Sequence, residues 1–295
     1  MPASRSSHRG ALLALGVTVL IWAYSWVVMK QAMAYAGPLD FAALRYLLGA
    51  GVLFAALLAS GKSLRPPPWL PTILIGLCQT AAFQGLEQWA LIDGGAGHVA
   101  LLAYTMPFWA VLLAWLVLGD KPTVRHWLGL TLAAVGLLCI IEPWHAMGSV
   151  LSTTLAIAGG AAWAGGTVLS KRMFQHHAPE LLNLTAWQML IGALVLGMVA
   201  LAVPQRAMVW NWPFIAALTY SVVLASSLAW WLWTIVLQRL STTVASVSSL
   251  GVPVTSVLLA WLILRERPSA MELFGILLVL LGLVAISGVG ARRRG

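Results

Sequence analysis

Polar side chains that could bind a charged solute gather in one otherwise apolar segment. Gln84, Glu87 and Gln88 fall at positions i, i+3 and i+4, so a helix would carry all three on one face. Glu87 is the only carboxylate well inside an apolar segment, where an ionised group is costly and tends to face a partner or a water-filled cavity. Arg45 lies at a similar depth in the preceding segment, which makes the two plausible ion-pair partners. We therefore weigh a structural ion pair near the headgroups against a site for a substrate amine or a proton.

Tryptophan is unusually abundant, with 16 residues, and several lie too deep for an interfacial belt. Trp22 and Trp163 occupy equivalent positions in two similar stretches of sequence, so we expect them to face each other across a central axis. Aromatic walls suit an apolar or aromatic solute and a cationic amine. Packing between helices is the alternative interpretation for any single one of these side chains.

Two prolines, Pro107 and Pro253, stand near the middle of apolar segments at equivalent positions. A proline inside a helix removes a backbone hydrogen bond and leaves a carbonyl without its partner. Nearby hydroxyl groups can satisfy such a carbonyl. We expect a pair of bendable gate helices that face a cavity, and a static kink that improves packing is the alternative.

Composition requires that these residues be positioned within lipid. Hydrophobic residues make up 61% of the 295 residues and charged residues 8%, and the mean hydropathy is +0.91. A soluble domain carries about 25% charged residues. The sequence therefore predicts an all-α integral membrane protein, and we assign the net charge of +9 to loops at the cytoplasmic face rather than to nucleic-acid binding.

Charge, proline and glycine clusters divide the chain into ten apolar segments, each long enough to cross the hydrocarbon. The predicted spans are 11–34, 40–60, 70–92, 96–119, 125–142, 150–173, 181–203, 213–237, 243–264 and 272–290. With the N-terminus inside, inner segments hold 12 Lys and Arg residues and outer ends hold 4. The positive-inside rule therefore predicts that both termini are cytoplasmic.

The two halves of the chain repeat each other. LLAWLVLGDKP at 112–122 and LLAWLILRERP at 258–268 share seven of eleven residues. Lys30 and Lys171 are another equivalent pair. We expect both to anchor helix ends at the interfaces, and a basic group at each mouth that meets a carboxylate is the alternative. Five spans is an odd number, so the second unit, 150–290, would be inverted relative to the first, 11–142. Two inverted five-helix repeats place a central cavity near the membrane midplane.

These stretches resemble a known family. WAYSWVVMK and WAGGTVLSK resemble the first span of each repeat in the drug/metabolite transporter superfamily, and GPLDFAALRYLLG is similar to its second span. A proline followed by LGDKP and a glycine-containing span, as in 107–136, resembles the fourth and fifth spans of an EamA-type repeat. The resemblance covers almost the whole chain and is greatest to bacterial inner-membrane amino-acid exporters, especially the aromatic amino-acid group.

The resemblance implies a multi-pass exporter in the bacterial inner membrane, with both termini cytoplasmic, that works by alternating access. We expect its substrate to be an amino acid with an aromatic or apolar side chain. The residues that we expect to bind it are Trp22, Trp26, Gln84, Glu87, Tyr104, Trp163, Gln188 and Ser249, with Pro107 and Pro253 as gating kinks. Related small multidrug exporters couple to protons through a carboxylate in the first helix. Spans 1 and 6 carry no Asp or Glu, which favours facilitated export.

A proton-coupled exporter of another metabolite or a lipophilic cation, using Glu87, is the alternative function. A lipid-modifying enzyme is not favoured, because we find no nucleophile with a base and no metal-ligand spacing. The sequence also lacks a glycine-rich nucleotide loop, so we expect neither ATP as energy source nor any cofactor. The expected partners are the small-molecule substrate and membrane lipid, and we expect a monomer.

Overall fold

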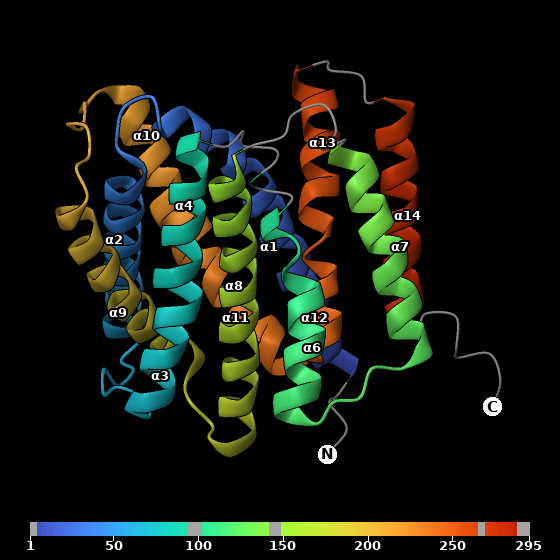
Figure 1. Ribbon diagram of the computed structural model, residues 1–295. Coiled ribbons are helices and arrows are strands. Elements are labelled where there is room, and N and C mark those ends of the chain that lie inside the picture. Colours follow the sequence, from blue (N-terminus) through green and yellow to red (C-terminus); the bar gives the residue numbers. More distant parts are fainter. Residues whose placement is uncertain (1–4, 94–98, 100–101, 142–148, 265–268, 288–295) are drawn as a thin grey trace.

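The structure is a computed structural model that describes residues 5–93, 99, 102–141, 149–264 and 269–287, and its regular secondary structure in these residues is helical. The helices run roughly side by side (Figure 1). In the first half of the chain they are α1 (Arg5–Ala32), α2 (Pro38–Ala59), α3 (Trp69–Ile75), η1 (Gly76–Ala82), α4 (Phe83–Asp93), α6 (Met106–Leu118) and α7 (Val124–Ile141). In the second half they are α8 (Val150–His176), α9 (Leu181–Ala202), α10 (Trp212–Tyr220), η3 (Ser221–Leu228), α11 (Ala229–Arg239), α12 (Thr242–Ser248), α13 (Gly251–Leu264) and α14 (Ala270–Ser287).

Several of these helices are long and apolar enough to span a membrane. Four such segments in the described residues are Gly10–Met29, Pro38–Ala59, Leu181–Ala202 and Trp212–Arg239, and shorter apolar helices accompany them. Large apolar side chains such as Leu13 and Leu201 lie exposed along the helix surfaces, where a soluble protein would carry charge. The chain is therefore a multi-pass membrane protein.

Two of the helical runs contain π-helical turns that the hydrophobic pattern did not indicate. η1 joins α3 to α4, and η3 joins α10 to α11, so each run stays continuous through a widened turn. The two π-helical segments lie about 145 residues apart in sequence, close to the spacing of the repeated motifs. π-turns leave backbone groups outside the regular hydrogen-bond ladder and are frequent at functional sites.

The bundle has α7 and α14 at one edge and α2 and α9 at the other, with α1 and α8 between them (Figure 1). Glycines permit the close approach of α7 and α14. A Cβ added to Gly136 would lie 2.6 Å from the carbonyl oxygen of Gly275, and one added to Gly282 would lie 2.6 Å from that of Gly129. These four glycines therefore serve helix packing.

The prolines do not interrupt continuous helices, which corrects the sequence-based expectation. Pro107 is the second residue of α6, after a turn at Tyr104 and Thr105. Pro253 is the third residue of α13, after a turn at Ser249 and Leu250. The first turn of a helix has no partners for its N–H groups, so a proline there costs no hydrogen bond. Each predicted span is thus broken before its proline, and the proline starts the next helix.

Polar contacts tie the connecting segments together at both ends of the bundle. At one end Lys62 forms a 2.7 Å ion pair with Glu180, and Asn183 donates to the backbone carbonyls of Ser63 and Arg65. At the other end Gln205 accepts a hydrogen bond from the backbone N–H of Leu39, 3.2 Å away. The α2–α3 and α8–α9 connections therefore share one end, and the α1–α2 and α9–α10 connections share the other.

Lys171 caps a helix rather than reaching toward the headgroups. Its Nζ donates to the carbonyls of Leu237 and Leu240, at 2.9 and 2.6 Å, at the C-terminal end of α11. The lysine thus satisfies carbonyls that no residue of α11 can pair. The side chain of Lys30, its counterpart, lies outside the described residues.

We expect Lys171→Met to lower the midpoint of thermal unfolding in detergent clearly, because hydrogen bonds to a charged group contribute about 1.5–3 kcal/mol. Lys62→Met is the matched control. It removes the exposed Lys62–Glu180 pair, and such pairs contribute about 0–1 kcal/mol. Equal midpoints for the two variants would contradict the capping role of Lys171.

Candidate functional site

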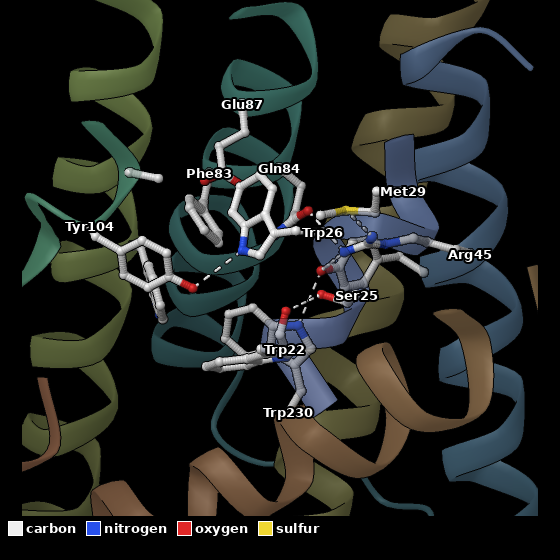
Figure 2. A pocket seen from close by; sticks show the side chains of 13 residues that line it. Trp22, Ser25, Trp26, Met29, Arg45, Phe83, Gln84, Glu87, Tyr104 and Trp230 are labelled. Carbon is white, nitrogen blue, oxygen red and sulfur yellow. Dashed lines mark hydrogen bonds between the residues drawn. The ribbon is translucent and has the colours of Figure 1, made fainter. Parts of the chain in front are cut away.

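A cavity of about 40 Å³ lies among α1, α2, α4, α8 and α11. Aromatic side chains form most of its wall, and a few polar groups lie among them (Figure 2). The lining residues are Trp22, Ser25, Trp26, Met29, Arg45, Tyr46, Phe83, Gln84, Glu87, Ala103, Tyr104, Trp163 and Trp230. A mostly apolar cavity with a few convergent polar groups is typical of small-molecule sites.

Arg45 and Gln84 form the centre of the polar wall. Arg45 is only 4% exposed, and its guanidinium donates to Tyr46 Oη at 2.7 Å, to Gln84 Oε1 at 3.0 Å and to Met29 Sδ at 2.9 Å. Its ring contacts are also close, with the guanidinium carbon 4.6 Å from the centroid of Tyr46. Neutral groups therefore hold this buried cation in place.

Arg45 and Glu87 do not form the ion pair that their matching depth predicted. In the described residues the one ion pair within 4.0 Å is Lys62–Glu180. Glu87 is 4% exposed, and its Oε1 has no hydrogen-bond partner. The Nε of Arg45 is also buried without a partner. The sequence suggested that Glu87 would lie beside Arg45. Gln84, one helical turn before Glu87 on α4, accepts the hydrogen bond from Arg45 instead.

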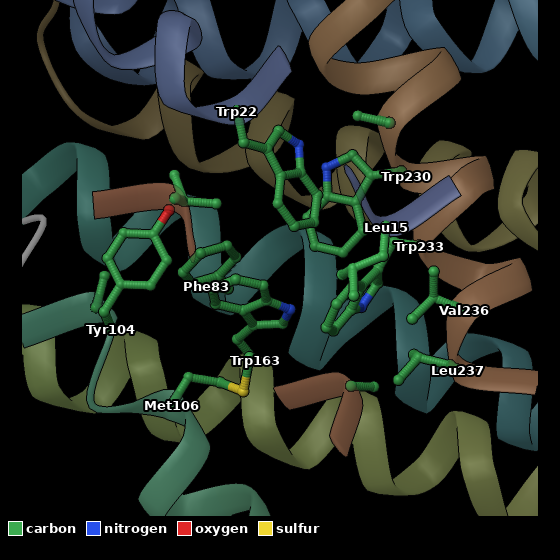
Figure 3. Packing of buried hydrophobic residues seen from close by; sticks show 14 of the residues in the cluster. Leu15, Trp22, Phe83, Tyr104, Met106, Trp163, Trp230, Trp233, Val236 and Leu237 are labelled. Carbon is green, nitrogen blue, oxygen red and sulfur yellow. The ribbon is translucent and has the colours of Figure 1, made fainter. Parts of the chain in front are cut away.

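The aromatic wall is a contiguous cluster of rings (Figure 3). Trp163 stacks on Phe83, with centroids 4.8 Å apart and an interplanar angle of 26°. Trp22 meets Trp163 edge-on at 5.6 Å, and Trp230 meets Trp22 at 5.2 Å. The expected approach of Trp22 and Trp163 is confirmed. Offset and edge-on rings attract each other electrostatically beyond their buried area, so this wall is well defined.

Hydrogen bonds fix the orientation of three of the indoles. Trp22 Nε1 donates to the carbonyl of Ala225, within the π-helical segment η3, at 3.1 Å. Trp26 Nε1 donates to Tyr104 Oη at 3.4 Å, and Trp230 Nε1 donates to Tyr46 Oη at 3.1 Å. Trp163 differs, because its buried Nε1 has no hydrogen-bond partner.

Six of the eight predicted binding residues line this cavity. They are Trp22, Trp26, Gln84, Glu87, Tyr104 and Trp163. Gln188 does not: its Oε1 accepts a 2.8 Å hydrogen bond from Thr80, so it pairs α9 with η1 instead. Ser249 also lies outside the lining, in the turn between α12 and α13, where its hydroxyl donates to the Ser246 carbonyl at 2.6 Å. Both polar groups are thus used in contacts within the bundle.

Sequence reasoning did not assign several lining residues to the site. Ser25 and Met29 lie at helical spacing from Trp22 and Trp26 on α1, so the helical period could have found them. Tyr46 and Phe83 were indistinguishable from packing residues. Their role in the wall depends on which helices meet around the cavity.

A cavity with aromatic and polar walls among membrane-spanning helices is the arrangement expected of a membrane transport protein. The model of the EamA-like transporter family matches residues 8–142 and again residues 151–288. The chain belongs to this family.

Curated relatives resemble the chain along almost its whole length. It is 28% identical to "Uncharacterized transporter YoaV" of Bacillus subtilis, over 96% of this chain and 98% of the relative. It is 29% identical to a "Probable amino-acid metabolite efflux pump" of Salmonella typhimurium, over 97% and 98%, and 27% identical to the protein of that name from Escherichia coli, over 94% of each. A crystal structure superposes with a TM-score of 0.84 at 22% identity, covering 99% of this chain and all of the other, which supports the fold alone.

Proposed function

We propose that the chain exports amino acids with aromatic or apolar side chains across the bacterial inner membrane. The observation that carries this proposal is the joining of an aromatic wall, around Trp22 and Trp163, to a polar wall with Arg45 and Glu87 in one cavity. The rings would hold the side chain of the substrate, and the polar groups its amino and carboxyl groups. Relatives named as amino-acid metabolite efflux pumps agree with this substrate class.

The proposed mechanism is facilitative alternating access between two inverted five-helix repeats, 11–142 and 150–290. Support comes from matched features of the two halves: the π-helical turns η1 and η3, and the helix breaks before Pro107 and Pro253. Broken helices in equivalent positions are typical of transporters whose repeats rock around a shared site. The turns before the two prolines, rather than the prolines alone, would then act as the hinges.

Efflux from proteoliposomes tests the proposal. Vesicles containing the purified protein are loaded in turn with labelled Trp, Phe, Thr and a lipophilic cation, with and without a proton gradient. We expect saturable efflux of Trp and Phe at a rate that the gradient does not change. Efflux of the cation without efflux of any of the amino acids would overturn the proposal.

A proton-coupled exporter of another metabolite or a lipophilic cation is the second candidate function, and the unpartnered carboxylate oxygen of Glu87 is the observation that favours it. Glu87→Gln separates the two functions, because glutamine has a similar shape but cannot carry a proton. If transport is facilitative, an imposed pH gradient leaves wild-type flux unchanged. Gradient-driven flux in the wild type that disappears in Glu87→Gln would establish proton coupling.

A further inference from the structure

We infer that Arg45 and Glu87 form a clamp of opposite charges that selects zwitterions, with Arg45 binding the substrate carboxylate and Glu87 its ammonium group. This assignment rests on the proposed function, and it deepens that function by giving each charge a separate role. It makes Arg45 a specificity-determining residue of the cavity.

Arg45 has both the charge and the free donor that a carboxylate needs. It lines the cavity, is 4% exposed, and contacts only neutral groups in the described residues, namely Met29, Tyr46 and Gln84. Its Nε is buried without a partner. A buried cation without a counter-ion is costly, and the carboxylate of a bound solute would supply both the charge and the missing acceptor.

Glu87, one helical turn from Gln84, is an acidic side chain that also lacks a partner. Its Oε1 is buried and unpartnered, and none of its oxygens lies within 4.0 Å of a nitrogen of Arg45. The two side chains line one cavity and do not form an ion pair with each other. An α-amino acid carries its own pair of opposite charges side by side, so it can satisfy both groups at once, whereas an amine or an acid alone would leave one of them unpaired.

The rings restrict the side chain that the substrate can carry beside its two charged groups. Phe83 and Gln84 are neighbours on α4, so the aromatic wall begins where the polar wall ends (Figure 2). Trp163 adds the ring that stacks on Phe83. A zwitterion whose side chain is aromatic or apolar therefore matches both parts of the cavity.

Transport of three matched solutes tests the clamp. Tryptophan carries both charges, tryptamine lacks the carboxylate, and indole-3-propionate lacks the ammonium group. Flux of each is measured in proteoliposomes for the wild type, Arg45→Gln and Glu87→Gln. We expect the wild type to move tryptophan at least ~10-fold faster than either analogue, since each analogue lacks the partner for one charge-assisted hydrogen bond. Arg45→Gln should lose the preference over tryptamine alone, and Glu87→Gln the preference over indole-3-propionate alone.

Charge-retaining variants provide the control and a second test if either glutamine variant does not fold. Arg45→Lys and Glu87→Asp should keep the wild-type order of the three solutes at lower rates. A uniform loss for all three solutes in both glutamine variants, or a changed order in Arg45→Lys, would overturn the clamp. A wild type that moves no amino acid would instead refute the proposed function itself, so the two failures are distinguishable.

Discussion

Trp163→Ala is expected to reduce saturable tryptophan efflux at least ~10-fold, a loss of about 1.4 kcal/mol in binding or in the transport barrier. Trp163 is 3% exposed and contacts the rings of Trp22, Phe83 and Tyr104 at the cavity. Alanine removes the stacked surface against which the side chain of the substrate would lie. Flux is measured in proteoliposomes over a range of internal substrate concentrations.

The same substitution also removes a large buried side chain, and such losses cost about 3–5 kcal/mol of folding stability. Trp163→Phe therefore accompanies it, because this variant keeps a ring against Phe83 and should retain the fold and a larger share of the flux. Trp127→Ala is the matched control at an exposed tryptophan, and its flux should equal that of the wild type. Unchanged flux in both Trp163→Ala and Gln84→Ala would show that this cavity does not bind the substrate.

Gly192→Ala is expected to destabilise the protein strongly. Gly192 lies on α9 against η1, and a Cβ there would be 2.6 Å from Thr80 Cγ2 and 2.8 Å from the carbonyl oxygen of Gly76. The clash involves backbone, so side-chain rotation alone cannot relieve it. Overpacking costs typically about 1–3 kcal/mol. The midpoint of thermal unfolding in detergent should fall, and the Thr80–Gln188 hydrogen bond beside the contact would be disturbed as well.

Gly197→Ala provides a control on the same helix. An added Cβ at Gly197 would meet nothing within 4 Å, and alanine is the better helix former by about 0.8–1.0 kcal/mol. This variant should unfold at the same temperature as the wild type or higher. A Gly192→Ala protein as stable as Gly197→Ala would show that α9 and η1 are not in such close contact.

The sequence by itself determined the class of protein and the approximate helix positions. Hydrocarbon thickness sets the length of an apolar segment whatever its neighbours are, so α2, predicted at 40–60, is Pro38–Ala59, and α9, predicted at 181–203, is Leu181–Ala202. The repeated stretches also led us to expect Trp22 and Trp163 to face each other, and their ring centroids lie 5.6 Å apart.

The tertiary structure alone decided the partners of each polar side chain. One residue along a helix turns the side chain by about 100°, and a shift of one turn along the axis changes its neighbour. For this reason Arg45 meets Gln84 rather than Glu87, and Gln188 meets Thr80 rather than the cavity. The same dependence on helix rotation and axial offset leaves Arg45 and Glu87 in one cavity without an ion pair between them. The length and periodicity of the apolar segments cannot predict that placement.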